Sequence, residues 1–279
     1  MFFGPTDQAR AKPFGPDFGV SGVGLVHRNG EDYIALFTLL KPDTTEQPLH
    51  QVELIDPKSD QLIYAATQLA MPGEPLDRVR VVHVPDIIRK ATAGTAVHGA
   101  LRGTAGPRVT WANGRTGFLT AGHVAVGTAI VTDGHGAALG TTIYALDPAT
   151  PAAGSRPNVD VAVIEVPASA ATTAFTPGAP LAGSAAINLH LGKGLTASTV
   201  LGMISWFVWP SIGGTYVDLY MTNATCTVAG DSGATATTGA RDAVGMVVGG
   251  AATFTSYIQD IHRQISTLTM AAGLGALSL

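Results

Sequence analysis

Short apolar runs separated by turn-forming residues fill the chain from residue 109 onward. Residues 109–111 and 116–119 flank Asn113-Gly114, a dipeptide that favours a tight turn between two strands. Residues 160–166 form a nearly continuous apolar run, which is typical of a strand buried on both faces. Many short strands with regular turns indicate a barrel or a sandwich. Further strands are expected over residues 129–132, 138–144, 199–209, 216–221 and 243–248.

Helical spacing occurs once in this region, near its end. Ile258, Ile261, Ile265 and Leu268 recur at intervals of three and four residues, so they share one face of a helix. We therefore expect a C-terminal helix over residues 257–268.

The first 95 residues have a different pattern. Apolar runs at 20–26 and 33–40 flank Asn29-Gly30, which predicts a hairpin. Residues 60–71 have helical spacing, and residues 78–84 have the pattern of a strand. Together these elements predict a small α/β module.

Charged side chains are also concentrated in this first part. Residues 1–95 hold 21 charged side chains, whereas residues 96–279 hold only 15 in almost twice the length. A shift of this size predicts two units, a small α/β N-terminal module over 1–95 and a mainly β domain over 96–279.

The overall composition limits the ligands and surroundings that we expect for the chain. Charged residues make up 13% of the chain and the net charge is −4, with no basic stripe, so we expect no nucleic-acid binding. No apolar run reaches the ~18 residues of a membrane span. Gly22-Val23-Gly24 lacks the third glycine of a dinucleotide fingerprint, and we expect neither a cofactor nor a metal.

The compartment is predicted from cysteine content and from the first residues. The single cysteine, Cys226, rules out an internal disulfide, and disulfides are typical of secreted proteins. The first residues have neither the basic segment nor the apolar core of a signal peptide. We therefore expect a cytoplasmic protein.

Three short motifs carry the candidate chemistry. Thr120-Ala121-Gly122-His123 comes first, Asp160-Val161-Ala162-Val163 follows, and Gly230-Asp231-Ser232-Gly233 comes last. Alone, each has a plain structural explanation: a satisfied histidine, a loop aspartate or a serine in a glycine-rich turn. A histidine, an aspartate and a serine are also the side chains that a serine protease combines.

In this order and these contexts, the motifs resemble those of the chymotrypsin-like (trypsin-like) serine peptidases, particularly the bacterial ones. The resemblance spans residues 97–268 and implies a double β-barrel with a C-terminal helix. It implies that His123 is the general base, that Asp160 orients His123 and that Ser232 is the nucleophile. The backbone N–H groups of Gly230 and Ser232 would form the oxyanion hole. The first 95 residues resemble, in general pattern only, modules that precede some bacterial members.

The resemblance also indicates where a substrate binds. The strand after the nucleophile, at Val248, Gly249 and Gly250, would pair with the substrate backbone. Cys226 lies in the segment that helps to form the first specificity pocket, or it is simply a small buried residue. The residues expected to line this pocket are small and apolar, which favours an uncharged side chain before the cleaved bond.

Other assignments fit less well. The nucleophile of α/β-hydrolases lies in Gly-x-Ser-x-Gly, upstream of its acid and histidine, whereas Ala234 stands two residues after Ser232. Asp133 and Asp147 are the other candidates for the acid beside His123. Both adjoin turn-forming residues, and a role in a turn is sufficient to explain them. Asp231 is expected to pair with an arginine or with polar backbone rather than with a newly cleaved amino terminus.

Three functions remain open. The chain is expected to be a serine endopeptidase acting on protein or peptide substrates, in which residues 1–95 bind a regulatory protein, another partner or the substrate. It is alternatively a self-processing protease, which would yield a fragment with a new terminus near residues 90–97. The third possibility is a binding protein that keeps the fold with an idle site.

Overall fold

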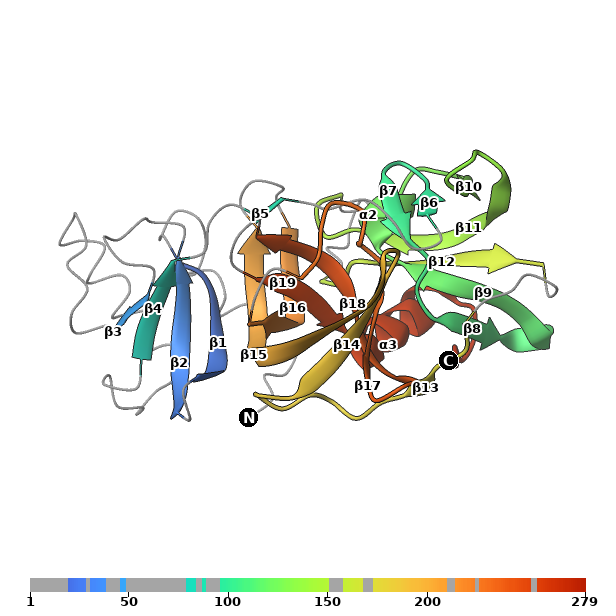
Figure 1. The fold of residues 1–279 in the computed structure, drawn as a ribbon. Coiled ribbons are helices and arrows are strands. Elements are labelled where there is room, and N and C mark those ends of the chain that lie inside the picture. The colour runs from blue at the N-terminus through green and yellow to red at the C-terminus, as the bar shows by residue number, and fades with distance from the viewer. Residues whose placement is uncertain are drawn as a thin grey trace.

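The described part of the chain forms two β-sheets with short helices beside them (Figure 1). The computed structural model describes residues 20–28, 31–38, 46–48, 79–83, 87–88, 96–150, 158–167, 173–209, 214–223, 226–251 and 255–279. The helix expected over residues 60–71 and the turn at Asn29-Gly30 lie outside these residues.

The first sheet has seven described strands in the order β7-β6-β10-β11-β12-β9-β8, all antiparallel. The hairpin predicted at Asn113-Gly114 is confirmed: a single 3-10 turn links its strands, with Gly114 at φ 70°. The strands are β6 (Ala96–His98), β7 (Arg102–Thr104), β8 (Arg108–Trp111), β9 (Arg115–Thr120), β10 (Ile130–Thr132), β11 (Ala138–Leu146) and β12 (Val161–Val166).

The second sheet contains a closed ring of six antiparallel strands. The ring runs β14-β17-β18-β19-β16-β15 and closes because β15 also pairs with β14. The two sheets therefore form two barrel-like halves, as the resemblance implied. The ring strands are β14 (Ala186–Leu191), β15 (Gly194–Trp209), β16 (Gly214–Thr222), β17 (Thr235–Thr238), β18 (Asp242–Ala251) and β19 (Ser256–Asp260), and the short β13 (Thr176–Pro177) adds to β18.

Strands from the first 95 residues extend this second sheet. β14 pairs with β15 only up to Thr199, and β1 takes the same edge from Gly202 onward. The pairing of β1 with β2 and the presence of β4 confirm the three strands predicted there. The added strands are β1 (Val20–Arg28), β2 (Glu31–Thr38), β3 (Glu46–Pro48) and β4 (Val79–His83), and they lie beside the ring in Figure 1; a separate short strand, β5 (Ile87–Ile88), pairs with β18.

The C-terminal helix, α3 (Ile261–Ala272), starts later than the apolar spacing predicted. Residues 256–260 form β19 instead, because β16 and β18 on either side supply its hydrogen-bond partners. Asp260 then caps the helix by accepting a hydrogen bond from the backbone N–H of Arg263 at 2.9 Å. Gly273, at φ 62°, ends it.

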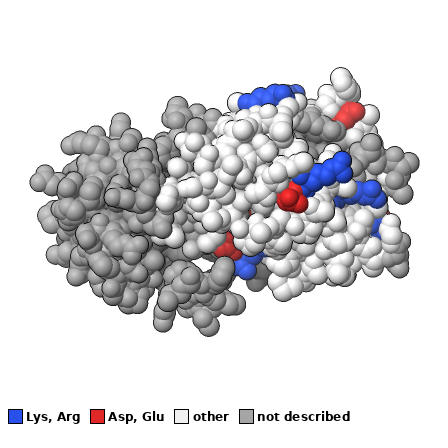
Figure 2. Space-filling view, turned by 60° about the horizontal axis from the view of Figure 1, so that its bottom comes forward, with Lys and Arg blue, Asp and Glu red and all other residues white. Residues whose placement is uncertain are grey.

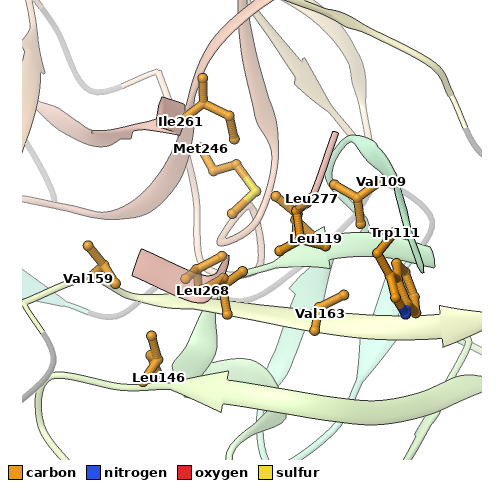
Figure 3. Packing of buried hydrophobic residues seen from close by; sticks show 11 residues of the cluster. Val109, Trp111, Leu119, Leu146, Val159, Val163, Met246, Ile261, Leu268 and Leu277 are labelled. Carbon is orange, nitrogen blue, oxygen red and sulfur yellow. The ribbon is translucent and has the colours of Figure 1, made fainter. Parts of the chain in front are cut away.

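A core cluster joins the first sheet to β18 and α3 (Figure 3). Leu119, Met246 and Leu268 come from these three places and are each completely buried. Replacing a buried leucine of this kind by alanine typically costs about 2–5 kcal/mol. Because Val159 and Val161 belong to the same cluster, the residue between them, Asp160, is held at the junction of the two halves.

The described surface carries little charge. On the face drawn in Figure 2, charged side chains of either sign are few and scattered among uncharged residues. None of the helices in the described part of the chain has the length and apolar composition needed to cross a bilayer.

Candidate active site

His123 is placed by a close backbone contact just before it. It lies in the one-turn helix α2 (Gly122–Ala125), directly after β9. A Cβ atom on Gly122 would overlap the carbonyl oxygen of Leu146 and lie 2.9 Å from the backbone nitrogen of Val161. Only glycine allows this approach, which brings His123 against the start of β12.

His123 and Asp160 are joined by two hydrogen bonds. The Nδ1 atom of His123 lies 2.6 Å from Oδ2 of Asp160, and the backbone N–H of His123 donates to Oδ1 at 2.9 Å. An ionised carboxylate can only accept, so Nδ1 carries the proton and Nε2 of the neutral ring is left as an acceptor. Nε2 is buried and has no hydrogen-bond partner among the described residues.

Two glutamines hold the backbone of Asp160, and sequence reasoning missed both. Gln259 Oε1 accepts from the N–H of Asp160 at 2.8 Å, while its Nε2 donates to the carbonyls of Asn158 and Val217. Gln264 Nε2 donates to the carbonyl of Asp160 at 3.1 Å. Both glutamines are completely buried. Gln264 is three residues after Ile261 and four before Leu268, so it adjoins the apolar face of the helix, whereas no such signal marks Gln259.

Ser232 lies in a tight turn that its neighbours stabilise. The N–H of Asp231 donates to Val228 O at 3.1 Å, and the N–H of Val228 donates to Asp231 Oδ2 at 2.7 Å. Gly230 has φ 106°, a conformation that side chains larger than glycine rarely adopt. Asp231 thus bonds to polar backbone, one of the two partners expected for it.

Thr104 and Thr120 bring this turn beside His123. The N–H of Thr104 donates to Ser232 O and its hydroxyl to Gly230 O, both at 2.7 Å, while the Thr120 hydroxyl donates to Thr104 O. A Cβ atom on Gly233 would lie 3.1 Å from the backbone nitrogen of Ala121, two residues before His123. The three sequence motifs therefore meet at one place between the two barrels, where Ser232 is completely buried.

Val248, Gly249 and Gly250 lie on β18, beyond the point where β17 stops covering its edge at Met246. The turn that holds Ser232 reaches the same edge, because the N–H of Gly233 donates to Val247 O at 2.8 Å. This edge therefore starts next to Ser232 and continues along the residues expected to bind substrate.

Cys226 is half-buried near Ser256, whose Oγ lies 3.5 Å from the cysteine Sγ. Ser256 Oγ also lies 2.7 Å from Thr227 Oγ1. A Cβ atom on Gly250 would lie 3.3 Å from that threonine oxygen. The surroundings of Cys226 and Gly250 therefore contain hydroxyl groups, in addition to the small apolar residues that the sequence suggested.

Asp133 and Asp147, the other candidates for the acid beside His123, stabilise backbone turns instead. Asp133 Oδ1 accepts from the backbone N–H groups of His135 and Ala137, and these bonds are the main cause that lowers the pKa of this carboxyl. Asp147 Oδ1 accepts from the N–H of Ala149 at 3.0 Å. The described residues contain no group of three or more His, Cys, Asp or Glu side chains that could hold a metal ion.

Comparison with known proteins identifies the fold. No protein-family model matches the chain, and no curated protein sequence matches it. Among solved structures, Nocardiopsis protease is 22% identical with a TM-score of 0.51, and the match covers 68% of this chain and 98% of that one. Thermobifida fusca protease A is 22% identical with a TM-score of 0.50, again covering 68% and 98%.

A glutamic-acid-specific serine protease is 21% identical with a TM-score of 0.52, and the match covers 63% of this chain and 97% of that protease. The chain therefore has the fold of the bacterial chymotrypsin-like serine proteases, as its three motifs predicted. About a third of the chain lies outside each of these matches.

Proposed function

We propose that this protein is a serine endopeptidase. Ser232 is the nucleophile, His123 the general base and Asp160 the residue that orients and stabilises His123. The proposal is supported by the fold and by the meeting of the three motifs between the barrels. The single observation that carries it is the 2.6 Å hydrogen bond between His123 Nδ1 and Asp160 Oδ2, because it leaves Nε2 as the proton acceptor.

The reaction has two halves. Ser232 Oγ attacks the carbonyl carbon of the peptide bond while its proton passes to His123 Nε2. The N–H groups of Gly230 and Ser232 stabilise the resulting oxyanion, and the loss of one such donor typically costs about 3 kcal/mol. The amine then leaves with the proton from His123, and water hydrolyses the acyl-enzyme by the same steps.

The test is covalent labelling by a fluorophosphonate, read by intact mass and peptide mapping. Wild-type protein is expected to gain one adduct on Ser232, and Ser232→Ala none. Ser266→Ala, which removes an exposed helix serine, is the matched control and is expected to label like the wild type. Folded wild-type protein that gains no adduct would contradict the proposal and favour an idle site.

The proposed substrate-binding site lies along β18. We place the substrate backbone against Val248, Gly249 and Gly250, and the side chain before the cleaved bond near Cys226. That side chain is expected to be uncharged, which a library of peptides varied at this position would test.

The proposal also includes a binding partner and a cellular compartment. Residues 1–95 form a module that binds a regulatory protein, which affinity capture with and without these residues would examine. The single cysteine suits a reducing compartment, and we place the protein in the cytoplasm.

A further inference from the structure

One short segment of the chain lies on the edge of β18 beyond the nucleophile turn. β5 (Ile87–Ile88) pairs antiparallel with it, Ile88 opposite Gly250 and Ile87 opposite Ala251. β19 takes the other edge of Gly250 through Ser256. The strand edge that runs on from Ser232 is therefore occupied at Gly250 by this chain itself.

The direction of β5 relates it to Ser232. Because the pairing is antiparallel, the step from Ile87 to Ile88 runs along β18 from Ala251 toward Val247. Val247 O accepts from the N–H of Gly233, the residue after Ser232. Gly250 and Val247 are three residues apart, which is about 10 Å along an extended strand. β5 thus has the position and direction of a peptide bound upstream of the nucleophile.

We propose that Ile87–Ile88 is a peptide bound in cis to the substrate edge of β18. The site then selects extended peptides with β-branched aliphatic residues opposite Gly250 and Ala251, and it is closed to them until β5 leaves. The inhibition by β5 rests on the proposed function, whereas the occupancy of the β18 edge can be measured in protein that has no activity. Recognition is by strand addition, in which backbone hydrogen bonds give affinity and alternate side chains give selectivity.

The size of the effect follows from competition within one molecule. A segment tethered by a short linker has an effective concentration in the millimolar range. If the edge is free in fewer than about one molecule in ten, the apparent affinity for an external peptide is reduced about tenfold or more.

The experiment releases β5 by the double substitution Ile87→Asp/Ile88→Asp. Ile130→Asp is the matched control, because Ile130 lies on a strand of the first sheet and is 58% exposed. Occupancy is read in a Ser232→Ala background by hydrogen exchange over residues 247–251. Exchange is expected to accelerate in the double variant and to stay unchanged in the control. Unchanged exchange in the double variant would overturn the proposal.

The consequence is read as KM for a peptide substrate, with Ser232 active. KM is expected to fall about tenfold in the double variant with kcat unchanged. Faster exchange with an unchanged KM would overturn the inhibitory role. Absence of labelling and turnover in every variant would contradict the proposed function, and the exchange result would still report whether β5 occupies the edge.

Selectivity is tested by adding a peptide in trans to the double variant that carries Ser232→Ala. A peptide with the sequence of residues 83–92 is expected to restore protection over residues 247–251. The same peptide with aspartate in place of both isoleucines is expected not to, and equal protection by both would overturn the aliphatic preference. Ile88→Ser is a milder variant that checks the same exchange if the double variant fails to fold.

Discussion

Gln259 accepts a hydrogen bond from the backbone N–H of Asp160 at 2.8 Å. Gln259 belongs to β19 of the second barrel, whereas Asp160 precedes β12 of the first. A side chain of one barrel therefore holds the backbone of the residue that hydrogen-bonds to His123 in the other. The geometry of the candidate site depends on how the two halves pack together.

Replacing Gln259 by methionine is expected to reduce both stability and the labelling rate of Ser232. Methionine keeps the approximate volume but removes the acceptor for the N–H of Asp160 and the donor to the carbonyls of Asn158 and Val217, of which the Asn158 carbonyl still accepts from the N–H of Val217. A buried group that loses its hydrogen bond typically costs about 1–3 kcal/mol. Urea unfolding measures the first effect and fluorophosphonate kinetics the second. Wild-type stability in the variant would show that Gln259 does not hold Asp160.

Asp160→Asn is expected to lower kcat by about 10⁴-fold while the fold is kept, because the amide no longer selects the tautomer with the proton on Nδ1. Turnover of a peptide substrate at neutral pH measures the effect. Circular dichroism checks the fold of the same sample. A fall of less than tenfold would argue against a role for Asp160 in orienting His123.

Gly122→Ala is expected to lower the free energy of unfolding by about 1–3 kcal/mol or more, because its methyl group would overlap Leu146 O. Gly134→Ala is the control, since a Cβ atom there would lie 3.4 Å from that of Ala96, an ordinary contact. Thermal unfolding of the two variants side by side gives the comparison. Similar losses in both would refute a special requirement at Gly122.

His190 is expected to make the stability depend on pH on the acid side. Desolvation lowers the pKa of His190, whose Nε2 lies 3.1 Å from Thr237 Oγ1. The unfolded chain then binds more protons than the folded one, so stability is full above about pH 6.5 and falls as the pH drops through the unfolded pKa. Urea midpoints at pH 8 and pH 5.5 should show a shallower fall in His190→Gln than in the wild type.

The strands and turns of this protein follow largely from local signals. Asn113-Gly114 predicted its hairpin, and the apolar run after Asp160 predicted the buried strand β12. The predicted start of the C-terminal helix was wrong, because residues 257–260 fit helical spacing but pair with β16 and β18 instead. Local propensity could not reveal those partners.

The sequence by itself indicated the candidate residues, through motifs that resemble those of a known family. It also determined most of the turns and strands in which they lie, because turn geometry and side-chain alternation act over a few residues. Only the tertiary structure decided which distant groups meet: Gln259 with Asp160, β1 with the end of β15, and Ile88 with Gly250. Strand pairing uses backbone groups that every residue has, so register and partner depend on the packing of the whole sheet. That packing determines both the geometry around His123 and the edge on which β5 lies.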